Sequence, residues 1–167
     1  MHLLRSTILK CISLVVVAVF LCGCSDNTGK KLPEFTATTL SGKTINSKDL
    51  KGKIVVLKIW ATWCGPCVLE IPSLNGVVDK YKNDSSIVFI AITDDTKGKI
   101  EHFLKDRPFA YQQIADAKNL KLLFQPGLRK EIPKHIIVDR DMNIVLDLSG
   151  GSENIAEIIS TKIEQLK

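Results

Sequence analysis

The feature that most constrains the fold is an apolar strand pattern that leads directly into two closely spaced cysteines. Residues 53–60 are β-branched and almost continuously apolar, which is typical of a strand covered on both faces of a sheet. Cys64 and Cys67 follow this run, and apolar residues then recur at helical spacing as far as Tyr81. The pattern therefore places the cysteines where a central strand gives way to a helix.

Further strands and helices alternate along the rest of the chain. Two short strands around a turn at residues 41–43 predict a hairpin, and residues 47–50 predict a brief helical turn after it. Pro72 should kink the helix that begins at the cysteines. Later patterns predict strands at residues 87–93, 109–114, 135–139 and 144–148, and helices at residues 97–105, 117–124 and 153–166. This order predicts one α/β domain with a central mixed β-sheet flanked by helices.

The first residues of the chain have the composition of a targeting segment. A basic start precedes a short apolar run that ends at Leu21, and this run is too short to span a membrane comfortably. Leu21 to Cys24 resembles the lipobox of bacterial lipoproteins, which implies removal of residues 1–23 as a lipoprotein signal peptide and lipid attachment at Cys24. We then expect a polar tether at residues 24–31 and the folded domain at residues 32–167. An uncleaved signal anchor is the alternative, and both interpretations place the domain outside the cytoplasm.

Charge and composition indicate a single solvated domain. The chain of 167 residues carries a formal net charge of +5, and its lysines are interleaved with acidic and apolar residues. Such a distribution is typical of a solvated surface and predicts no nucleic-acid partner. With 45% apolar and 25% charged residues, the composition excludes a disordered or polytopic chain.

Cys64 and Cys67 have the spacing of an exchangeable dithiol. A helix start offers unpaired backbone N–H groups and the positive end of the helix dipole, which stabilise a thiolate, so we expect Cys64 to act as the nucleophile. Cys67 lies further into the helix, and we expect it to act as the resolving thiol. A structural disulfide and a zinc half-site are the alternatives. The zinc site would need His102 and His135, because the chain has no second cysteine pair after the targeting segment.

Residues 60–67 resemble the active-site segment of the thioredoxin superfamily, and Ile132 with Pro133 resembles the cis-proline loop of the same superfamily. This resemblance implies a thioredoxin-like fold and a redox-active disulfide between Cys64 and Cys67. It implies no cofactor and no metal. The residues that it implies for substrate binding are Trp63, Gly65, Pro66, Ile132 and Pro133.

The finer resemblance is to the membrane-anchored TlpA and ResA group, and it extends from Leu32 to nearly the end of the chain. The predicted hairpin resembles the N-terminal extension of that group. The stretch between Cys67 and Pro133 has room for the strand–helix element that the group inserts. Glu70 to Pro72 resembles a Glu-apolar-Pro step that follows the second cysteine. This match implies that Glu70, with a pKa raised by partial desolvation, takes part in proton transfer.

Lys58 departs from the superfamily pattern, because classical thioredoxin has a buried acid at this position. Either the lysine side chain reaches the surface, or it stabilises a thiolate in a different way. His102 and His135 are expected to be surface or packing residues without a part in the mechanism.

These patterns together predict a thiol–disulfide oxidoreductase in the cell envelope, lipid-anchored to a membrane and facing the periplasm or the cell exterior. It would reduce disulfides of envelope proteins and take electrons from a membrane thiol donor, and oxidation or isomerisation of disulfides is the alternative. The family resemblance implies haem-attachment proteins of cytochrome c maturation as one class of substrate.

Two alternative functions lack the cysteine pattern that each would need. A peroxiredoxin-like peroxidase would carry the pattern Pro-x-x-x-Thr/Ser-x-x-Cys, but no proline stands at the required position before Cys64 or before Cys67. A metal-binding module of the copper-chaperone type would need a wider cysteine spacing than this chain has.

Overall fold

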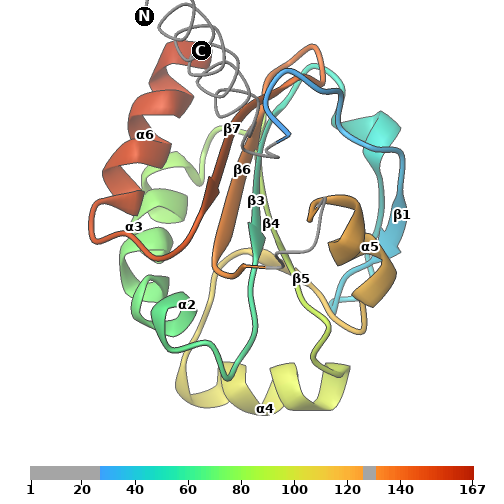
Figure 1. Ribbon diagram of the computed structural model, residues 1–167, viewed down its shortest axis with the longest axis vertical. Coiled ribbons are helices and arrows are strands. Elements are labelled where there is room, and N and C mark those ends of the chain that lie inside the picture. The colour runs from blue at the N-terminus through green and yellow to red at the C-terminus, as the bar shows by residue number, and fades with distance from the viewer. Residues whose placement is uncertain (1–26, 126–130) are drawn as a thin grey trace, which may run out of the picture.

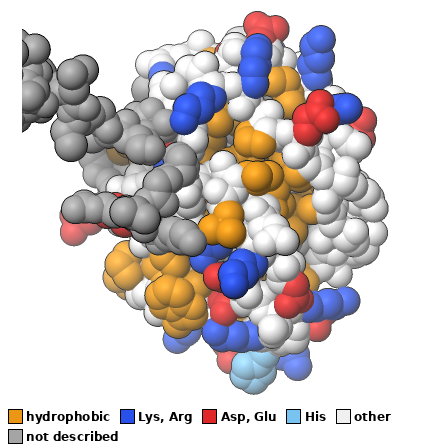
Figure 2. Space-filling view, turned by 45° about the vertical axis from the view of Figure 1, so that its right-hand side comes forward, with side chains coloured by type: hydrophobic (Ala, Val, Ile, Leu, Met, Phe, Trp, Pro, Cys, Tyr) orange, Lys and Arg blue, Asp and Glu red, His pale blue; other side chains and the backbone are white. Residues whose placement is uncertain are grey.

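The computed structural model describes residues 27–125 and 131–167, and its centre is a five-stranded sheet with helices on both faces (Figure 1). The predicted signal peptide at residues 1–23 and the predicted lipid site at Cys24 lie outside the described residues. Basic and acidic side chains are mixed over the face that Figure 2 shows. This mixture agrees with the solvated surface that the charge distribution predicted.

The sheet has the strand order β5, β4, β3, β6, β7. Its strands are β3 (Ile54–Ile59), β4 (Ile87–Ile92), β5 (Gln112–Ile114), β6 (Lys134–Val138) and β7 (Ile144–Ser149). Strands β3, β4 and β5 are parallel, whereas β6 is antiparallel to both β3 and β7. Every residue of β3 is buried. The predictions of a mixed sheet and of a central strand covered on both faces are confirmed.

The helices follow the predicted ranges, with one division. They are α2 (Gly65–Leu69), α3 (Ile71–Tyr81), α4 (Lys97–Asp106), α5 (Lys118–Leu123) and α6 (Ile155–Leu166). The helix expected from the cysteines to Tyr81 is divided at Glu70. Pro72 lies in the first turn of α3, where its missing N–H needs no partner within the helix.

The side chains of β3 alternate between two apolar cores, because successive residues of a strand point to opposite faces. One core lies under α3 and α6 and includes Ile54, Val56 and Trp60. The other lies on the hairpin side and includes Val55, Leu57 and Ile59. Lys58 shares its face with Val56 and therefore points into the core under α3.

The predicted N-terminal hairpin is present as β1 (Thr36–Thr38) and β2 (Thr44–Asn46), followed by the 3-10 helix η1 (Ser47–Leu50). The strand–helix pair β5 and α5 lies between α4 and β6 in the chain. Strand β5 begins at Gln112 rather than at residue 109. The aromatic side chains before it, Phe109 and Tyr111, are buried in the core under α3 without joining the strand ladder.

The segment before the hairpin lies along the domain. From Asn27 onward the predicted tether is described, and the N–H of Gly29 donates a hydrogen bond to the carbonyl of Ile144 at 2.9 Å. The N–H of Leu32 donates to the carbonyl of Met142 at 2.8 Å. This part of the chain contacts the turn between β6 and β7, so the ordered contacts begin before the predicted domain boundary at residue 32.

Candidate active site

Cys64 and Cys67 form a disulfide at the point where β3 gives way to α2. Their Cα atoms are 5.2 Å apart. Cys64 is the N-cap residue of α2, and its Sγ accepts a hydrogen bond from the backbone N–H of Cys67 at 3.2 Å. Cys64 keeps an exposed fraction of 5%, whereas Cys67 is fully buried. Cys64 is thus the outer residue of the pair and Cys67 the inner one.

Exposed residues surround the disulfide on the solvent side. The side chain of Trp63 is 68% exposed, whereas Trp60 is fully buried in the core. Gly65 and Pro66 are also exposed. Gly151, in the loop between β7 and α6, lies so close to the proline ring that an added Cβ would be 3.0 Å from the Cβ of Pro66. This loop therefore approaches α2 at a position where a side chain would crowd the active-site proline.

The peptide bond between Ile132 and Pro133 is cis, as the superfamily resemblance implied. Pro133 directly precedes β6, whose first residue, Lys134, pairs with Ile59 at the end of β3. The chain continues from Ile59 towards the cysteines, so the cis-proline segment lies at the same end of the sheet as the disulfide. The carbonyl of Pro133 accepts a hydrogen bond from the N–H of Gly150 at 2.8 Å.

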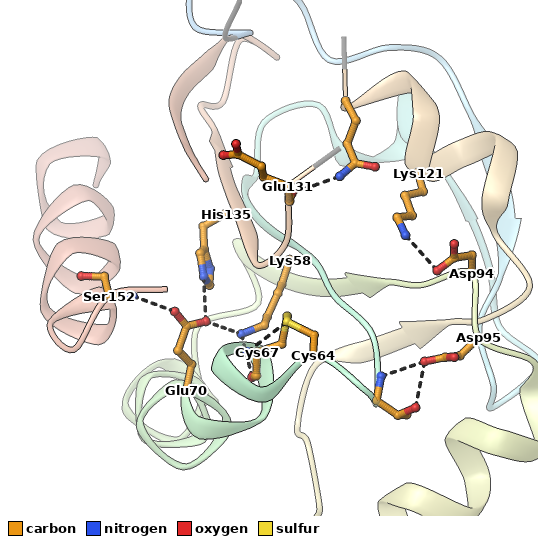
Figure 3. The surroundings of a disulfide bond; sticks show 12 residues. Lys58, Cys64, Cys67, Glu70, Asp94, Asp95, Lys121, Glu131, His135 and Ser152 are labelled. Carbon is orange, nitrogen blue, oxygen red and sulfur yellow. Dashed lines mark hydrogen bonds and ion pairs between the residues drawn. A yellow bond between two sulfur atoms is a disulfide. The ribbon is translucent and has the colours of Figure 1, made fainter. Parts of the chain in front are cut away.

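Three buried ionisable side chains meet beneath Cys67 (Figure 3). Lys58 Nζ donates hydrogen bonds to Glu70 Oε2 at 2.6 Å and to the carbonyl oxygen of Cys67 at 3.2 Å. His135 Nε2 lies 3.0 Å from the same oxygen of Glu70, and the N–H of Ser152 donates to Glu70 Oε1 at 3.1 Å. Lys58 and His135 are fully buried. The Glu70 carboxylate thus has partners from β3, from β6 and from the loop before α6.

The neighbours of Glu70, rather than its burial, decide its charge. Burial alone would raise the pKa of the Glu70 carboxyl, but hydrogen bonds and charge from His135 and Lys58 outweigh burial and hold this pKa below its ordinary value. Burial lowers the pKa of Lys58 and of His135, although Glu70 opposes the shift in both. The expectation of a raised Glu70 pKa is therefore wrong, because it considered desolvation without the hydrogen-bond donors beside the carboxyl.

Sequence reasoning did not find the contact between these three residues. The interpretation in which Lys58 reaches the surface is wrong, because its side chain is fully enclosed. His135 is expected from the sequence to be a surface or packing residue, but it lies directly opposite Lys58 in the pairing of β3 with β6. Only the register of these two strands could have indicated that both side chains reach Glu70. His102 is exposed on α4, as expected.

A second polar cluster holds the loop that leads to Cys64. Asp95 follows β4, and its Oδ2 accepts hydrogen bonds from the N–H of Thr62 at 2.7 Å and from Thr62 Oγ1 at 3.0 Å (Figure 3). Lys99 of α4 pairs with the other carboxylate oxygen. Asp95 is buried, with an exposed fraction of 7%. Its role in fixing the active-site loop was not predicted, because the polar residues after β4 had the composition of an ordinary turn.

Three of the four residues that the zinc interpretation requires have other partners. The two cysteines are bonded to each other, and His135 is engaged with Glu70. Within residues 27–125 and 131–167, no group of three or more His, Cys, Asp or Glu residues is placed to hold a metal ion.

The sequence of the chain is similar to a known protein family and to several named proteins. Residues 28–146 match the AhpC/TSA family. The chain is 34% identical over 122 residues to the thiol-disulfide oxidoreductase ResA of Bacillus cereus, and the match covers 73% of this chain and 69% of that relative. The thioredoxin-like protein YneN of Bacillus subtilis is 27% identical over 134 residues, with 72% of this chain and 79% of the relative covered.

The fold is also similar to that of a solved structure. A solved structure from Chlorobium tepidum, described as a thiol:disulfide interchange protein DsbE, superposes with a TM-score of 0.74. The two proteins are 26% identical, and the match covers 85% of this chain and 99% of that chain. With the thioredoxin-like sheet, the disulfide at the start of α2 and these relatives, the chain belongs to the AhpC/TSA family and, within it, to the ResA-like thiol–disulfide oxidoreductases.

Proposed function

We propose that this oxidoreductase reduces disulfide bonds of proteins outside the cytoplasm by dithiol–disulfide exchange. The observation that carries the proposal is the Cys64–Cys67 disulfide itself, which joins an outer and an inner cysteine at the start of a helix. A stepwise exchange requires two cysteines that differ in solvent exposure. The exposed sulfur forms the mixed disulfide with the substrate, and the buried sulfur then releases the substrate from it.

In the proposed reaction the reduced protein begins the exchange through Cys64. The Cys64 thiolate attacks a sulfur of the substrate disulfide, which releases one substrate thiolate and leaves a mixed disulfide. Cys67 then loses its proton and attacks Cys64 Sγ, which releases the second substrate thiolate and forms the internal disulfide. Two electrons pass from the protein dithiol to the substrate disulfide.

Glu70 is the proposed proton acceptor in the second step. Because His135 and Lys58 hold its pKa low, the carboxylate is ionised at neutral pH and can accept the proton of a neighbouring thiol. Its position one helical turn beyond Cys67, with Lys58 contacting both residues, supports this role.

The proposed substrate surface consists of the exposed residues around Cys64 and the cis-proline segment. Trp63 offers a large exposed ring beside the nucleophile, and such rings bury much area when a partner binds. The other proposed members are Gly65, Pro66, Ile132 and Pro133. The cis-proline segment at the same sheet end would offer backbone groups to an extended substrate segment.

The proposed setting is the cell envelope, with the domain anchored through lipid on Cys24 and supplied with electrons by a membrane thiol donor. Support comes from the sequence around Cys24, which resembles a lipobox. Among the described residues, no helix has the length and apolarity needed to cross a membrane. Haem-attachment proteins of cytochrome c maturation are the proposed class of substrate within this setting.

A trapping experiment tests the proposal in the cells that make the protein. Replacing the resolving thiol in Cys67→Ser should stop the reaction at the mixed disulfide, so partner proteins should co-purify with the full chain and be released by dithiothreitol. The matched control, Cys64→Ser, should trap none of them. The proposal fails if Cys67→Ser traps no protein while Cys64→Ser still reduces insulin disulfides at the wild-type rate.

A further inference from the structure

The core beneath Cys67 contains a fully buried lysine whose own part in the thiol exchange has not been assigned. Lys58 lies on β3 with an exposed fraction of 0%, among the apolar residues of the core under α3. Its Nζ also lies 5.8 Å from the centre of the Phe109 ring. Burying an ammonium group is costly unless it is paired and hydrogen-bonded, and an apolar residue of similar size would fill this space at lower cost. The two groups that accept hydrogen bonds from Lys58 therefore indicate what its buried charge does.

The two hydrogen bonds of Lys58 go to the two residues that exchange a proton in the proposed resolving step. Nζ lies 2.6 Å from the Glu70 carboxylate and 3.2 Å from the carbonyl oxygen of Cys67. The ammonium group is therefore adjacent to both the proton acceptor and the residue that carries the proton donor. Figure 3 shows Lys58 between Glu70 and Cys67.

We propose that Lys58 is the shared counter-ion of Glu70 and Cys67 during resolution, and that His135 is the positioning residue that holds Glu70 for this step. The inference rests on the proposed assignment of Cys67 as the resolving thiol. Before the step, Lys58 neutralises the Glu70 carboxylate, and Cys67 is a thiol. The S–H bond of Cys67 then breaks and the proton passes to Glu70, so the negative charge moves to the sulfur.

The net charge of the buried site does not change during this transfer. An ammonium, a carboxylate and a thiol become an ammonium, a carboxylic acid and a thiolate. Lys58 Nζ contacts the Glu70 carboxylate and the backbone carbonyl of Cys67, so in the proposed step its positive charge stays beside the anion whichever of the two residues carries it. The Cys67 thiolate attacks Cys64 Sγ, the bond between Cys64 and the substrate breaks, and the substrate leaves as a thiolate that takes a proton from water.

His135 acts through Glu70 rather than on the sulfur. Its Nε2 is 3.0 Å from Glu70 Oε2, and the N–H of Ser152 binds the other oxygen at 3.1 Å. Burial lowers the pKa of His135, so the ring is neutral at pH 7 and Nε2 donates the proton of this hydrogen bond. Tyr111 is a further titratable side chain near Glu70, and burial with the charge of Glu70 raises its pKa, so it stays a neutral phenol.

Single-turnover kinetics with the full chain can separate the two steps. When the reduced protein meets the disulfide 5,5′-dithiobis(2-nitrobenzoate), the first chromophore leaves in a bimolecular step at Cys64, and the second leaves in a unimolecular step when Cys67 resolves the mixed disulfide. Lys58→Met should slow the second release at least about tenfold at pH 7, the effect of raising the pKa of the thiol by about one unit. It should also move the pH profile of this release to higher pH. The first release should keep its rate within about twofold.

Matched variants separate a charge effect from a packing effect. Lys121→Met removes another largely buried lysine, paired with Asp94 at 2.8 Å, and should change neither release. His135→Leu should slow the second release, and His135→Gln should restore most of it, because glutamine keeps an N–H donor near the position of Nε2. Cys64→Ser gives the background from the remaining cysteines.

The release rates of these variants decide whether Lys58 and His135 have the proposed roles. A wild-type second-release rate in Lys58→Met overturns it, and so does equal slowing of both releases without a change in the pH profile, which indicates a purely structural lysine. Failure of His135→Gln to recover the rate lost in His135→Leu overturns the role of His135. If the wild-type protein lacks a unimolecular second release, the proposed function fails as well, and this result is distinct from the others.

Discussion

At the scale of single residues, Glu70 and His135 link the active site to the acid stability of the fold. Burial lowers the pKa of His135 from its ordinary value of 6.5, with Lys58 adding to this effect and Glu70 opposing it. The pKa of Glu70 also lies below its ordinary value of 4.5, because its donors outweigh its burial. Each group therefore has a lower pKa in the folded chain than in the unfolded chain. Between these two values of a group, the unfolded chain binds more protons than the folded chain, so acid favours unfolding.

We therefore expect the free energy of unfolding to fall as the pH drops below about 6.5, first through His135 and then, below about 4.5, through Glu70. His135→Gln should flatten the upper part of this dependence, between pH 7 and pH 5, because glutamine does not titrate there. Urea unfolding at several pH values measures the effect. The exposed His102→Gln serves as the control and should keep the wild-type slope. Parallel profiles for His135→Gln and the wild type would contradict the assignment.

At the scale of elements, the loop between β3 and α2 depends on the end of β4. Asp95→Ala leaves the N–H and the hydroxyl of Thr62 without their carboxylate partner, so we expect a loss of about 1–3 kcal/mol in the free energy of unfolding. Thr62→Val removes only the hydroxyl bond and should cost about 1 kcal/mol. Because the two changes remove a shared interaction, the double variant should lose less than the two single losses combined.

Urea unfolding of the four proteins completes this cycle. Asp94→Ala is the neighbouring control: it breaks the pair with Lys121 and leaves the Thr62 loop intact. We also expect Asp95→Ala, but not Asp94→Ala, to slow insulin reduction, since the loop carries Cys64. Strictly additive losses for Asp95→Ala and Thr62→Val would show that the two residues do not support one another.

The elements formed by residues close in sequence were predictable, and the contacts between distant elements were not. Strand β3 and helix α3 were located because their apolar periods involve residues that are close in sequence. The cysteine pair was found for the same reason. The cluster at Glu70 could not be predicted in this way. It forms because Lys58 and His135 lie opposite one another in the pairing of β3 with β6, and residues so far apart in the sequence give no indication of that register. A local sequence pattern does not indicate which residues of two distant strands pair with one another.

At the scale of the whole molecule, the chain before the hairpin is part of the fold. Asn27 is 5% exposed, and its side chain donates to Asp147 Oδ2 at 2.7 Å and to the carbonyl of Phe124 at 3.1 Å. Asp147 in turn pairs with Lys134 of β6. Asn27 therefore joins the first described residues to β7 and to the end of α5. Hydrogen bonds of this kind are made between distant segments, so composition alone predicted a polar tether.

We expect Asn27→Ala to lower the free energy of unfolding by about 1–3 kcal/mol, because the buried Asp147 carboxylate and the Phe124 carbonyl each lose a donor. The backbone N–H of residue 27 would still donate to Asp147, so the segment should loosen rather than detach completely. Urea unfolding measures the stability, and limited proteolysis of the folded protein should show faster cleavage before the hairpin. Asn83→Ala, at an exposed position, is the matched control and should stay within about 0.5 kcal/mol of the wild type. Equal unfolding midpoints for Asn27→Ala and Asn83→Ala would mean that the segment adds nothing to the stability of the domain, and that the chain from Asn27 to Leu32 acts as the free tether that its composition predicted.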